Sequence, residues 1–336
     1  MDFRSLPKVE LHLHLDCSLS YEAVYRLAPS VTREEYDRDY VAPARCTNLA
    51  DFLTRAPKGV ELMQTESSLQ LVTQDLFRQL HEDGVVYAEI RFAPLLHLGG
   101  GLSAEEVVEA VDRATEAMIA ETGIQARLIL CSLRHFGEEQ SMETAELVEK
   151  FFGTRVAALD LAADEAGFPV EAHIRAFRYA REQGLFRTAH AGEGRGPESV
   201  WETLRLLEPQ RIGHGTRSIE DPELVEYLQR NHVHLELCPS ANVQIIASLD
   251  GWEQHPIDQL YRAGVRLSVN TDSRMLTRTT LTQEYERLSQ FFGWGPEQFL
   301  ETNLMAVEAA FVDSKIKANL RERITSAYAP AQTRGV

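Results

Sequence analysis

Long apolar runs are absent from this sequence of 336 residues, and cysteine is scarce. No run approaches the ~18 apolar residues of a membrane-spanning helix. The N-terminal segment, MDFRSLPKVE, has no apolar signal core. The four cysteines form no CxxC pair, which argues against a disulfide scaffold and favours a reducing compartment. We therefore expect a cytoplasmic protein.

Positive charge is also sparse. Basic residues number 34 against 51 acidic residues, so the net charge is -17, and no lysine or arginine cluster stands out. This balance argues against nucleic acid or an anionic membrane as the main partner and favours a small molecule. Hydrophobic residues make up 44% and charged residues 25%, which is typical of a globular protein with a large core.

Eight short apolar segments recur along the chain, each followed by a helix-like stretch. Amphipathic patterns at 67–83, 103–121, 168–183, 197–207 and 222–230 predict helices between them. The alternation predicts a (β/α)8 TIM barrel. An open doubly wound sheet is the alternative, weakened because no GxGxxG motif follows the first strand. The predicted strands are 9–15, 85–92, 126–133, 155–163, 185–192, 211–216, 234–239 and 265–272.

Two segments depart from the alternation. Residues 29–66 form a long insertion after the first strand, and its motif LADFL (49–53) predicts either a lid over the barrel mouth or a small satellite core. Helices are expected at 281–292, 296–312 and 313–328, with a frayed tail to residue 336. No linker or repeat is visible, so we expect one domain spanning 1–336.

Polar side chains gather at the predicted strand ends, where barrels place their reactive groups. The first strand carries His12 and His14, which share one face because strand side chains alternate. The fifth strand ends at His190, the sixth at His214 and the eighth at Asp272. Each residue alone is more simply a core or surface residue, but together they predict a catalytic metal site.

The natural assignment is one Zn²⁺ held by His12, His14, His190 and Asp272, with a position left open for water. Ligand type leaves iron and manganese open. A two-metal site bridged by a modified lysine is disfavoured, since none of the lysines ends a predicted strand.

Three residues beside the ligands are candidate catalytic groups. Glu193 can carry a proton to or from a substrate nitrogen. The non-functional alternative is that Glu193 is a carboxylate on a surface loop. His214 can accept a proton from metal-bound water or hold that water in line, although it can also be a core histidine. Its flanking glycines favour close backbone approach. Asp272 can serve as both ligand and orienter.

At these residues the sequence resembles the adenosine deaminase family of the metal-dependent amidohydrolase superfamily. The resemblance covers about residues 6–311 and is carried by PKVELHLHLD, DLAADE, HAGE, RIGHGT, LCPSAN and VNTD. It implies hydrolysis of adenosine or 2′-deoxyadenosine to inosine and ammonia. Glu193 would then donate a proton to N1 of the purine, and His214 would position the attacking hydroxide.

The resemblance also implies the substrate contacts. Asp16 would bond the ribose 5′-hydroxyl, and the backbone N–H of Ala163 would meet the purine. His14 and Ser273 belong to the same expected pocket. A hydrophobic gate completes it, formed by Leu49, Phe52 and Leu53.

Four positions depart from the family pattern, and they bear on the substrate. Cys17 and Ala163 replace glycines, Ser273 replaces an Asp or Asn, and Ala241 replaces a frequent Ser. A related deaminase of adenine, or of a 5′-modified adenosine such as aminofutalosine, is therefore the alternative. A non-catalytic nucleoside-binding protein on the same barrel is less favoured, because every expected ligand and Glu193 remain. A zinc hydrolase of an ester or lactone is a third reading.

Overall fold

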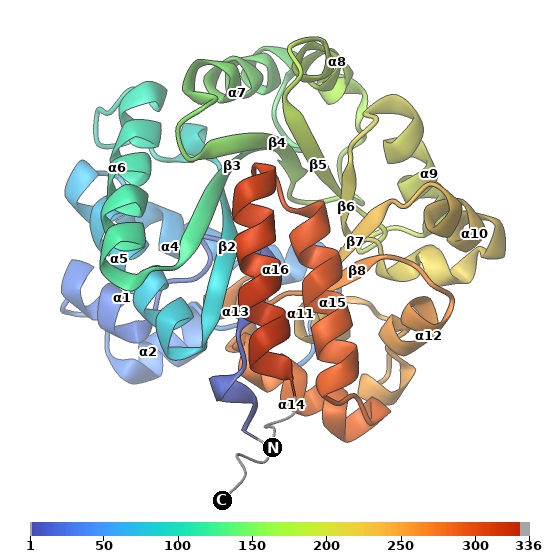
Figure 1. Cartoon of the computed structure of the whole chain (residues 1–336). Helices are drawn as coiled ribbons and strands as arrows, with labels where there is room; N and C mark the ends of the chain where they lie inside the picture. The colour runs from blue at the N-terminus through green and yellow to red at the C-terminus, as the bar shows by residue number, and fades with distance from the viewer. Residues whose placement is uncertain (1, 330–336) are drawn as a thin grey trace, which may run out of the picture.

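The computed structural model describes residues 2–329, which form an eight-stranded parallel sheet with helices around it (Figure 1). The strands follow one another in chain order, each paired with the next. Most are buried on both faces, which explains their continuous apolar character. They are β1 Lys8–His14, β2 Val85–Phe92, β3 Gln125–Leu133, β4 Val156–Ala162, β5 Phe186–Ala191, β6 Arg211–His214, β7 His234–Leu237 and β8 Leu267–Val269.

The sheet closes where the C-terminal ends of β1 and β8 meet. The N–H of His14 donates to the carbonyl of Asp272 at 2.7 Å, and the N–H of Asp272 donates to the carbonyl of His12 at 3.0 Å. These bonds join the last strand to the first, so the predicted (β/α)8 barrel is confirmed and the open sheet is wrong. They also bring two predicted ligand segments together.

Helices surround the strands, with small departures from the prediction. The helix expected at 168–183 begins only at Ile174, after a turn and a short 3-10 helix, and the helix expected to end at 312 ends at Ala309. The α-helices outside the insertion are α5 Glu66–Glu82, α6 Ala104–Thr122, α7 Glu138–Phe151, α8 Ile174–Glu182, α9 Pro197–Leu206, α10 Pro222–Arg230, α11 Pro239–Ile245, α12 Ile257–Arg262, α13 Arg274–Thr277, α14 Leu281–Phe292, α15 Pro296–Ala309 and α16 Ser314–Tyr328. Short 3-10 helices are η1 Phe3–Ser5, η2 Pro94–Leu96, η3 Glu171–His173, η4 Thr216–Glu220 and η5 Trp252–Gln254.

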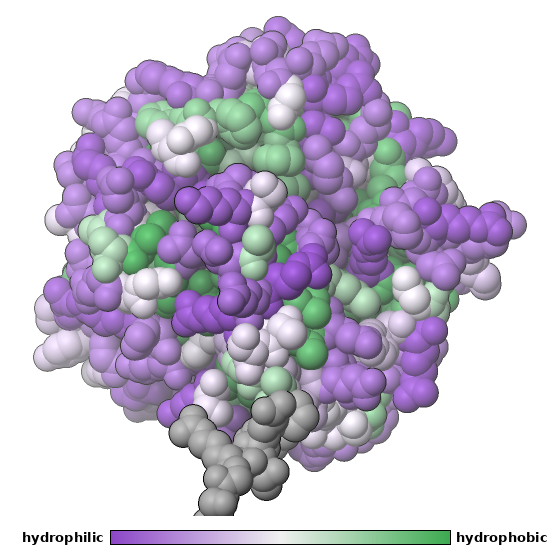
Figure 2. Space-filling model, viewed as in Figure 1, coloured by the Kyte–Doolittle hydropathy of each residue, from purple (hydrophilic) through white to green (hydrophobic). Residues whose placement is uncertain are grey.

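The N-terminal end of the barrel is covered by the end of the chain. In Figure 1, α15 and α16 lie across the front of the strands. Phe311, which follows α15, stacks on Phe186 at the start of β5 with ring centroids 4.7 Å apart, and the guanidinium of Arg211 lies 3.6 Å from its ring centre. Figure 2 shows this face as largely hydrophilic. The predicted tail beyond residue 329 lies outside the described residues.

The insertion after β1 folds into short helices. Helix α1 spans Tyr21–Leu27, and α2 (Arg33–Asp39), α3 (Leu49–Leu53) and α4 (Ala56–Leu62) lie within residues 29–66. The segment before α3 is tied to the end of α11, since Arg45 donates to the carbonyls of Val243 and Ala247. Among residues 2–329, no helix has the length and apolar character that crossing a bilayer requires.

Candidate active site

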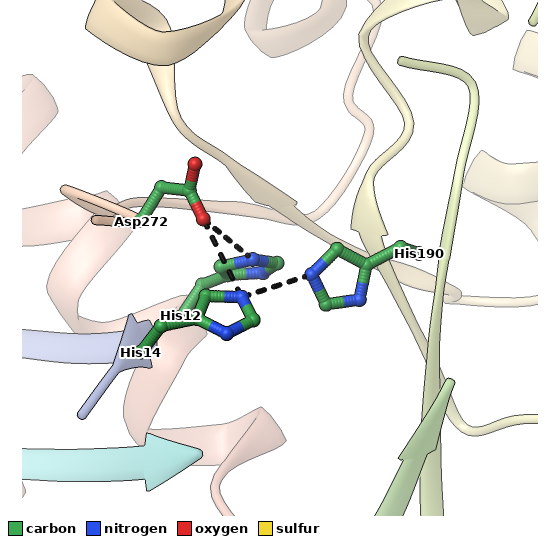
Figure 3. Close-up of side chains that lie close together, drawn as sticks. All are labelled: His12, His14, His190 and Asp272. Carbon is green, nitrogen blue, oxygen red and sulfur yellow. Dashed lines mark hydrogen bonds and ion pairs between the residues drawn. The ribbon is translucent and has the colours of Figure 1, made fainter. Parts of the chain in front are cut away.

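Four predicted ligands meet at the C-terminal end of the barrel, where Figure 3 shows three imidazole rings and one carboxylate turned toward one point. Oδ1 of Asp272 lies 3.4 Å from Nε2 of His12 and 3.5 Å from Nε2 of His14. Nε2 of His14 lies 3.2 Å from Nε2 of His190. The four atoms lie within 4.8 Å of one another, so one ion can contact all of them. The set comes from β1, β5 and the segment after β8, as predicted.

Two buried carboxylates determine which ring nitrogen carries the proton in two of the three ligand histidines. Glu236 Oε2 lies 2.8 Å from Nδ1 of His12, and Asp160 Oδ1 lies 3.2 Å from Nδ1 of His190. Arg91 bridges both carboxylates, at 2.9 Å to Asp160 and 2.6 Å to Glu236. Burial alone would raise the pKa of Glu236, but Arg91 and Arg211 hold that pKa at about 2. The ionised carboxylates therefore accept hydrogen bonds from the Nδ1–H groups of these two histidines. Nε2 of each ring then carries no proton, and its lone pair is free to bind a metal ion.

Those lone pairs fit a metal ion. Nε2 of His12 is buried and has no hydrogen-bond partner among residues 2–329. A buried nitrogen without a partner costs free energy unless something binds it. Three nitrogens and one carboxylate oxygen are a common donor set for catalytic zinc. The residues therefore fit the implied group.

A second set of possible ligands overlaps the first and contains His12, His214, Cys238 and Asp272. Burial raises the pKa of the Cys238 thiol well above its usual value, so the sulfur stays protonated. Since thiolate rather than thiol binds metals, this set is the weaker candidate.

Glu193 lies in a turn after β5 that a neighbouring carboxylate holds in place. Glu165 accepts the backbone N–H groups of Gly192, Glu193, Gly194 and Arg195, at 2.6–3.0 Å. The Glu193 side chain is itself buried. Desolvation first, then the charges of Asp272 and Glu165, raise the pKa of Glu193 well above its ordinary value. Burial thus favours the protonated form of Glu193 beside the ligand cluster, and because the side chain is buried the surface-loop alternative is wrong.

Three predicted site residues are among the six non-glycine residues of 2–329 that have a positive φ. His214, Asp272 and Ala163 have φ values of 60°, 65° and 78°, which glycine adopts freely and other residues rarely. At His214 the flanking glycines explain the geometry. A Cβ on Gly213 would lie 2.9 Å from Cε1 of His12. The predicted close approach is thus between β6 and β1.

A cavity of about 450 Å³ opens beside the cluster. His14 and Ala163 line one side of it, and Leu53 of α3 lies on another. Asp16 also lines it, accepting the N–H of Ala93 at 3.3 Å and lying 4.0 Å from Nε2 of His97, and burial raises the pKa of Asp16 to about 6.

A smaller hollow of about 40 Å³ adjoins the large cavity and contains most of the other predicted residues. It is lined by His14, Cys17, Leu49, Phe52, Leu53, Ala163, His190, Glu193, His214, Asp272 and Ser273. Predicted substrate contacts and predicted ligands thus face one space. Ala241 is fully buried in α11 and lines neither hollow.

Sequence reasoning missed the residues behind the ligands. Asp160, Glu236 and Arg91 are fully buried, yet they lie inside apolar strands. Glu165 follows β4 in the motif DLAADE and was likewise overlooked. A charged residue within an apolar strand was the available signal, because buried charges must be paired or bind something.

Comparison with known proteins agrees with the motifs. The model of the adenosine deaminase family matches residues 7–327. The adenosine deaminase of Lacticaseibacillus casei is 36% identical over 338 residues, covering 98% of this chain and 99% of its own. That of Clostridium acetobutylicum is 34% identical over 327 residues, covering 95% and 97%. The crystal structure of an adenine deaminase from Arthrobacter aurescens superposes with a TM-score of 0.88 at 27% identity, covering 96% and 98%. With its motifs, its barrel and these relatives in agreement, the chain belongs to the adenosine deaminase family.

Proposed function

We propose that this protein deaminates adenosine or 2′-deoxyadenosine hydrolytically, giving inosine and ammonia with one zinc ion per chain. The observation that carries the proposal is a cluster of three imidazoles and one carboxylate next to the buried carboxyl of Glu193, whose pKa burial raises. A metal site supplies a nucleophile, and an acid beside it serves a basic ring nitrogen. Hydrolysis of an ester or lactone does not require an acid that protonates a ring nitrogen. The metal cluster and Glu193 together therefore suit deamination of an aromatic ring better.

Zinc would be bound by His12, His14, His190 and Asp272. When bound, it would lower the pKa of a coordinated water toward neutrality and supply the hydroxide for attack at C6 of the purine. Glu236 and Asp160 would keep two of the ligand histidines in the tautomer that offers Nε2.

Glu193 would act on the ring nitrogen N1. Its raised pKa keeps a proton available at neutral pH. Giving that proton to N1 draws electrons from C6, which favours attack there and leads to loss of ammonia. His214 and Asp272 would orient the nucleophile from the other side.

The large cavity suits an uncharged nucleoside. Within residues 2–329 no lysine or arginine lines it, whereas Asp16 and Asp164 do. A phosphate group would therefore meet negative charge without a cation to pair with. Asp16 would bond the 5′-hydroxyl, the N–H of Ala163 would meet the purine, and His14 and Ser273 would contact the substrate nearby.

A 5′-modified adenosine is a second candidate, favoured by the apolar part of the cavity. Pro57 and Val60 of α4 and Leu96 line the same cavity as Asp16. An apolar substituent at the 5′ position would bury surface there.

The rest of the proposal concerns the lid, the domain and the location. Leu49, Phe52 and Leu53 would form a lid over either substrate. The chain would form a single domain spanning 1–336, with residues 29–66 as its insertion. We also propose a cytoplasmic location.

Ammonia release from a panel of aminopurines tests the proposal on protein of known zinc content. Adenosine and 2′-deoxyadenosine should give the highest kcat/KM, and adenosine 5′-monophosphate the lowest. A higher value for adenine or for a 5′-thioether adenosine would replace the substrate assignment. No ammonia from any member of the panel would reject the deaminase.

A further inference from the structure

The side-chain amide of Asn242 lies at the centre of a buried polar group behind the site. Asn242 belongs to α11 and is fully buried. Its Oδ1 lies 2.7 Å from Oγ1 of Thr216 and 3.3 Å from Nε2 of His255. Its Nδ2 lies 3.1 Å from Nδ1 of His214 and 3.4 Å from Oε1 of Glu193. One amide therefore touches both groups proposed to flank the reacting purine.

His255 determines which way this amide points. The backbone N–H of Ile257 donates to Nδ1 of His255 at 3.2 Å, so Nδ1 carries no proton. Burial lowers the pKa of His255 to about 3, so the ring is neutral and its single proton is on Nε2. That N–H must face an acceptor, which is Oδ1 of Asn242. The hydroxyl of Thr216 donates to the same oxygen.

With its oxygen turned toward His255, Asn242 presents its NH₂ group to His214. An amide nitrogen only donates, so Nδ1 of His214 must accept from it at 3.1 Å, although Oε1 of Glu193 also lies 3.3 Å from the same Nδ1. A proton on Nδ1 would face the amide N–H, so Nδ1 carries none. We propose that Asn242, oriented by His255, is a positioning residue that fixes His214 in the tautomer with its proton on Nε2. The role in catalysis rests on the proposed function, whereas the tautomer rests on the hydrogen bonds alone.

The tautomer decides what His214 can do. An imidazole with its proton on Nε2, and with Nδ1 already occupied, offers an N–H toward the hollow that His214 lines with Glu193 and Asp272. It can hold a nucleophile or a developing negative charge, but it cannot take up a proton there. The second N–H of Asn242 approaches Oε1 of Glu193, which leaves Oε2 to carry the acid's proton. One amide would thus make His214 a donor and orient the proton of Glu193.

Nitrogen-15 NMR of zinc-loaded protein labelled at histidine tests the proposal directly, with His214→Gln used to assign the resonances. We expect Nδ1 of His214 to resonate as an unprotonated nitrogen and Nε2 as a protonated one. A protonated Nδ1 overturns the proposal, whatever the substrate proves to be. The expected tautomer in a protein that releases no ammonia would instead reject only the deaminase.

Variants test the relay from His255 through Asn242 to His214. Asn242→Asp keeps the shape but presents an acceptor to His214, so the proton should move to Nδ1 and kcat should fall about 100-fold with KM little changed. His255→Leu removes the orienting donor and should lower kcat about 10-fold, whereas His255→Gln should recover most of that loss by restoring an N–H. Melting temperature and zinc content are measured for each. An Asn242→Asp protein with the original tautomer, or with unchanged kcat, contradicts the proposal.

His234→Leu is the matched control. His234 is also buried with a pKa lowered by burial to about 3, and its Nε2 lies 3.0 Å from the hydroxyl of Ser268. It stands at the start of β7, at the barrel's N-terminal end. Its loss should leave the His214 resonances unchanged and lower kcat much less than His255→Leu does. A change in either equal to that of His255→Leu would show that any buried histidine has this effect, which also overturns the relay.

Discussion

Buried polar groups serve different purposes at the two ends of the barrel. At the N-terminal end, Asn303 accepts the N–H of Val9 at 2.7 Å and donates to the hydroxyl of Tyr285 at 2.7 Å. Arg211 pairs there with Glu89 at 2.5 Å. At the C-terminal end, Nε2 of His12 is buried with no hydrogen-bond partner among residues 2–329.

The difference separates stability from function. Paired groups under a cover of helices hold the barrel closed. The unpartnered Nε2 of His12 and the raised pKa of Glu193 cost free energy, and they persist where the surrounding structure holds them. We therefore expect substitutions at the open end to change turnover, and substitutions at the closed end to change the free energy of unfolding.

The largest effect is expected for Glu193→Gln. Glutamine keeps the size of the neutral acid but cannot give a proton to N1, so kcat should fall about 10²- to 10⁴-fold with zinc retained. Since the folded pKa of Glu193 is raised and its protonated form is the active one, wild-type activity should fall as pH rises through that pKa. Steady-state rates on protein of measured zinc content check both. Near-normal turnover in the variant removes Glu193 from the mechanism.

The next effect is at the closed end, with Phe311→Ala. Removing a buried ring that stacks on Phe186 and lies against Arg211 should lower the free energy of unfolding by about 3–5 kcal/mol. Because Phe311 lines neither hollow of the site and meets it only through Arg211, kcat per folded, zinc-loaded protein should change little. Urea unfolding and active-site titration measure the two quantities. A fall in kcat without a fall in stability would remove the distinction between the two ends.

A smaller, pH-dependent effect is expected at Glu284 in α14. This carboxyl is buried, forms no hydrogen bond within residues 2–329, and lies 3.8 Å from Arg287. Burial raises its pKa from 4.5 to about 7, so its contribution to stability should be lost as pH rises from about 4.5 through 7.

Glu284→Gln tests this directly. The variant should be more stable than the wild type by roughly 3 kcal/mol at pH 8, because each pH unit between the unfolded and folded pKa values of Glu284 corresponds to about 1.36 kcal/mol. At pH 4 the two proteins should be equally stable. Equal stability at both pH values would mean that Glu284 is not held in its neutral form.

The smallest effect is expected for Ala163→Gly. Ala163 has a φ of 78°, so glycine should relieve about 1 kcal/mol of backbone strain while keeping the N–H proposed to contact the purine. Thermal unfolding and KM for adenosine are the measurements. A variant that is less stable than the wild type would mean that the Cβ of Ala163 packs favourably despite its dihedral angle.

The sequence predicted those parts of the molecule that follow local patterns. Apolar strands alternating with helices predicted the barrel, and the strand-end rule then placed His12, His14, His190 and Asp272 together. The 138–151 helix was missed because its sequence is polar and its apolar stripe is narrow. The helix expected to begin at residue 168 begins at Ile174 instead, because residues 165–167 form a turn and Pro169 follows it.

Contacts between distant segments were beyond sequence reasoning. Glu236 meets His12 across 224 positions, and Asn242 meets Glu193 across 49. Such pairings depend on how far each strand is shifted against its neighbours, which single segments do not encode. The orientation of the Asn242 amide depends further on His255, which no sequence motif marks as a site residue.

The proposed chemistry depends most on one metal ion at the open end. Protein stripped by a chelator and then titrated with Zn²⁺ should regain adenosine deamination in proportion to bound zinc, reaching full activity at one ion per chain. Full activity in the metal-free protein, or a plateau only at two ions per chain, would contradict it.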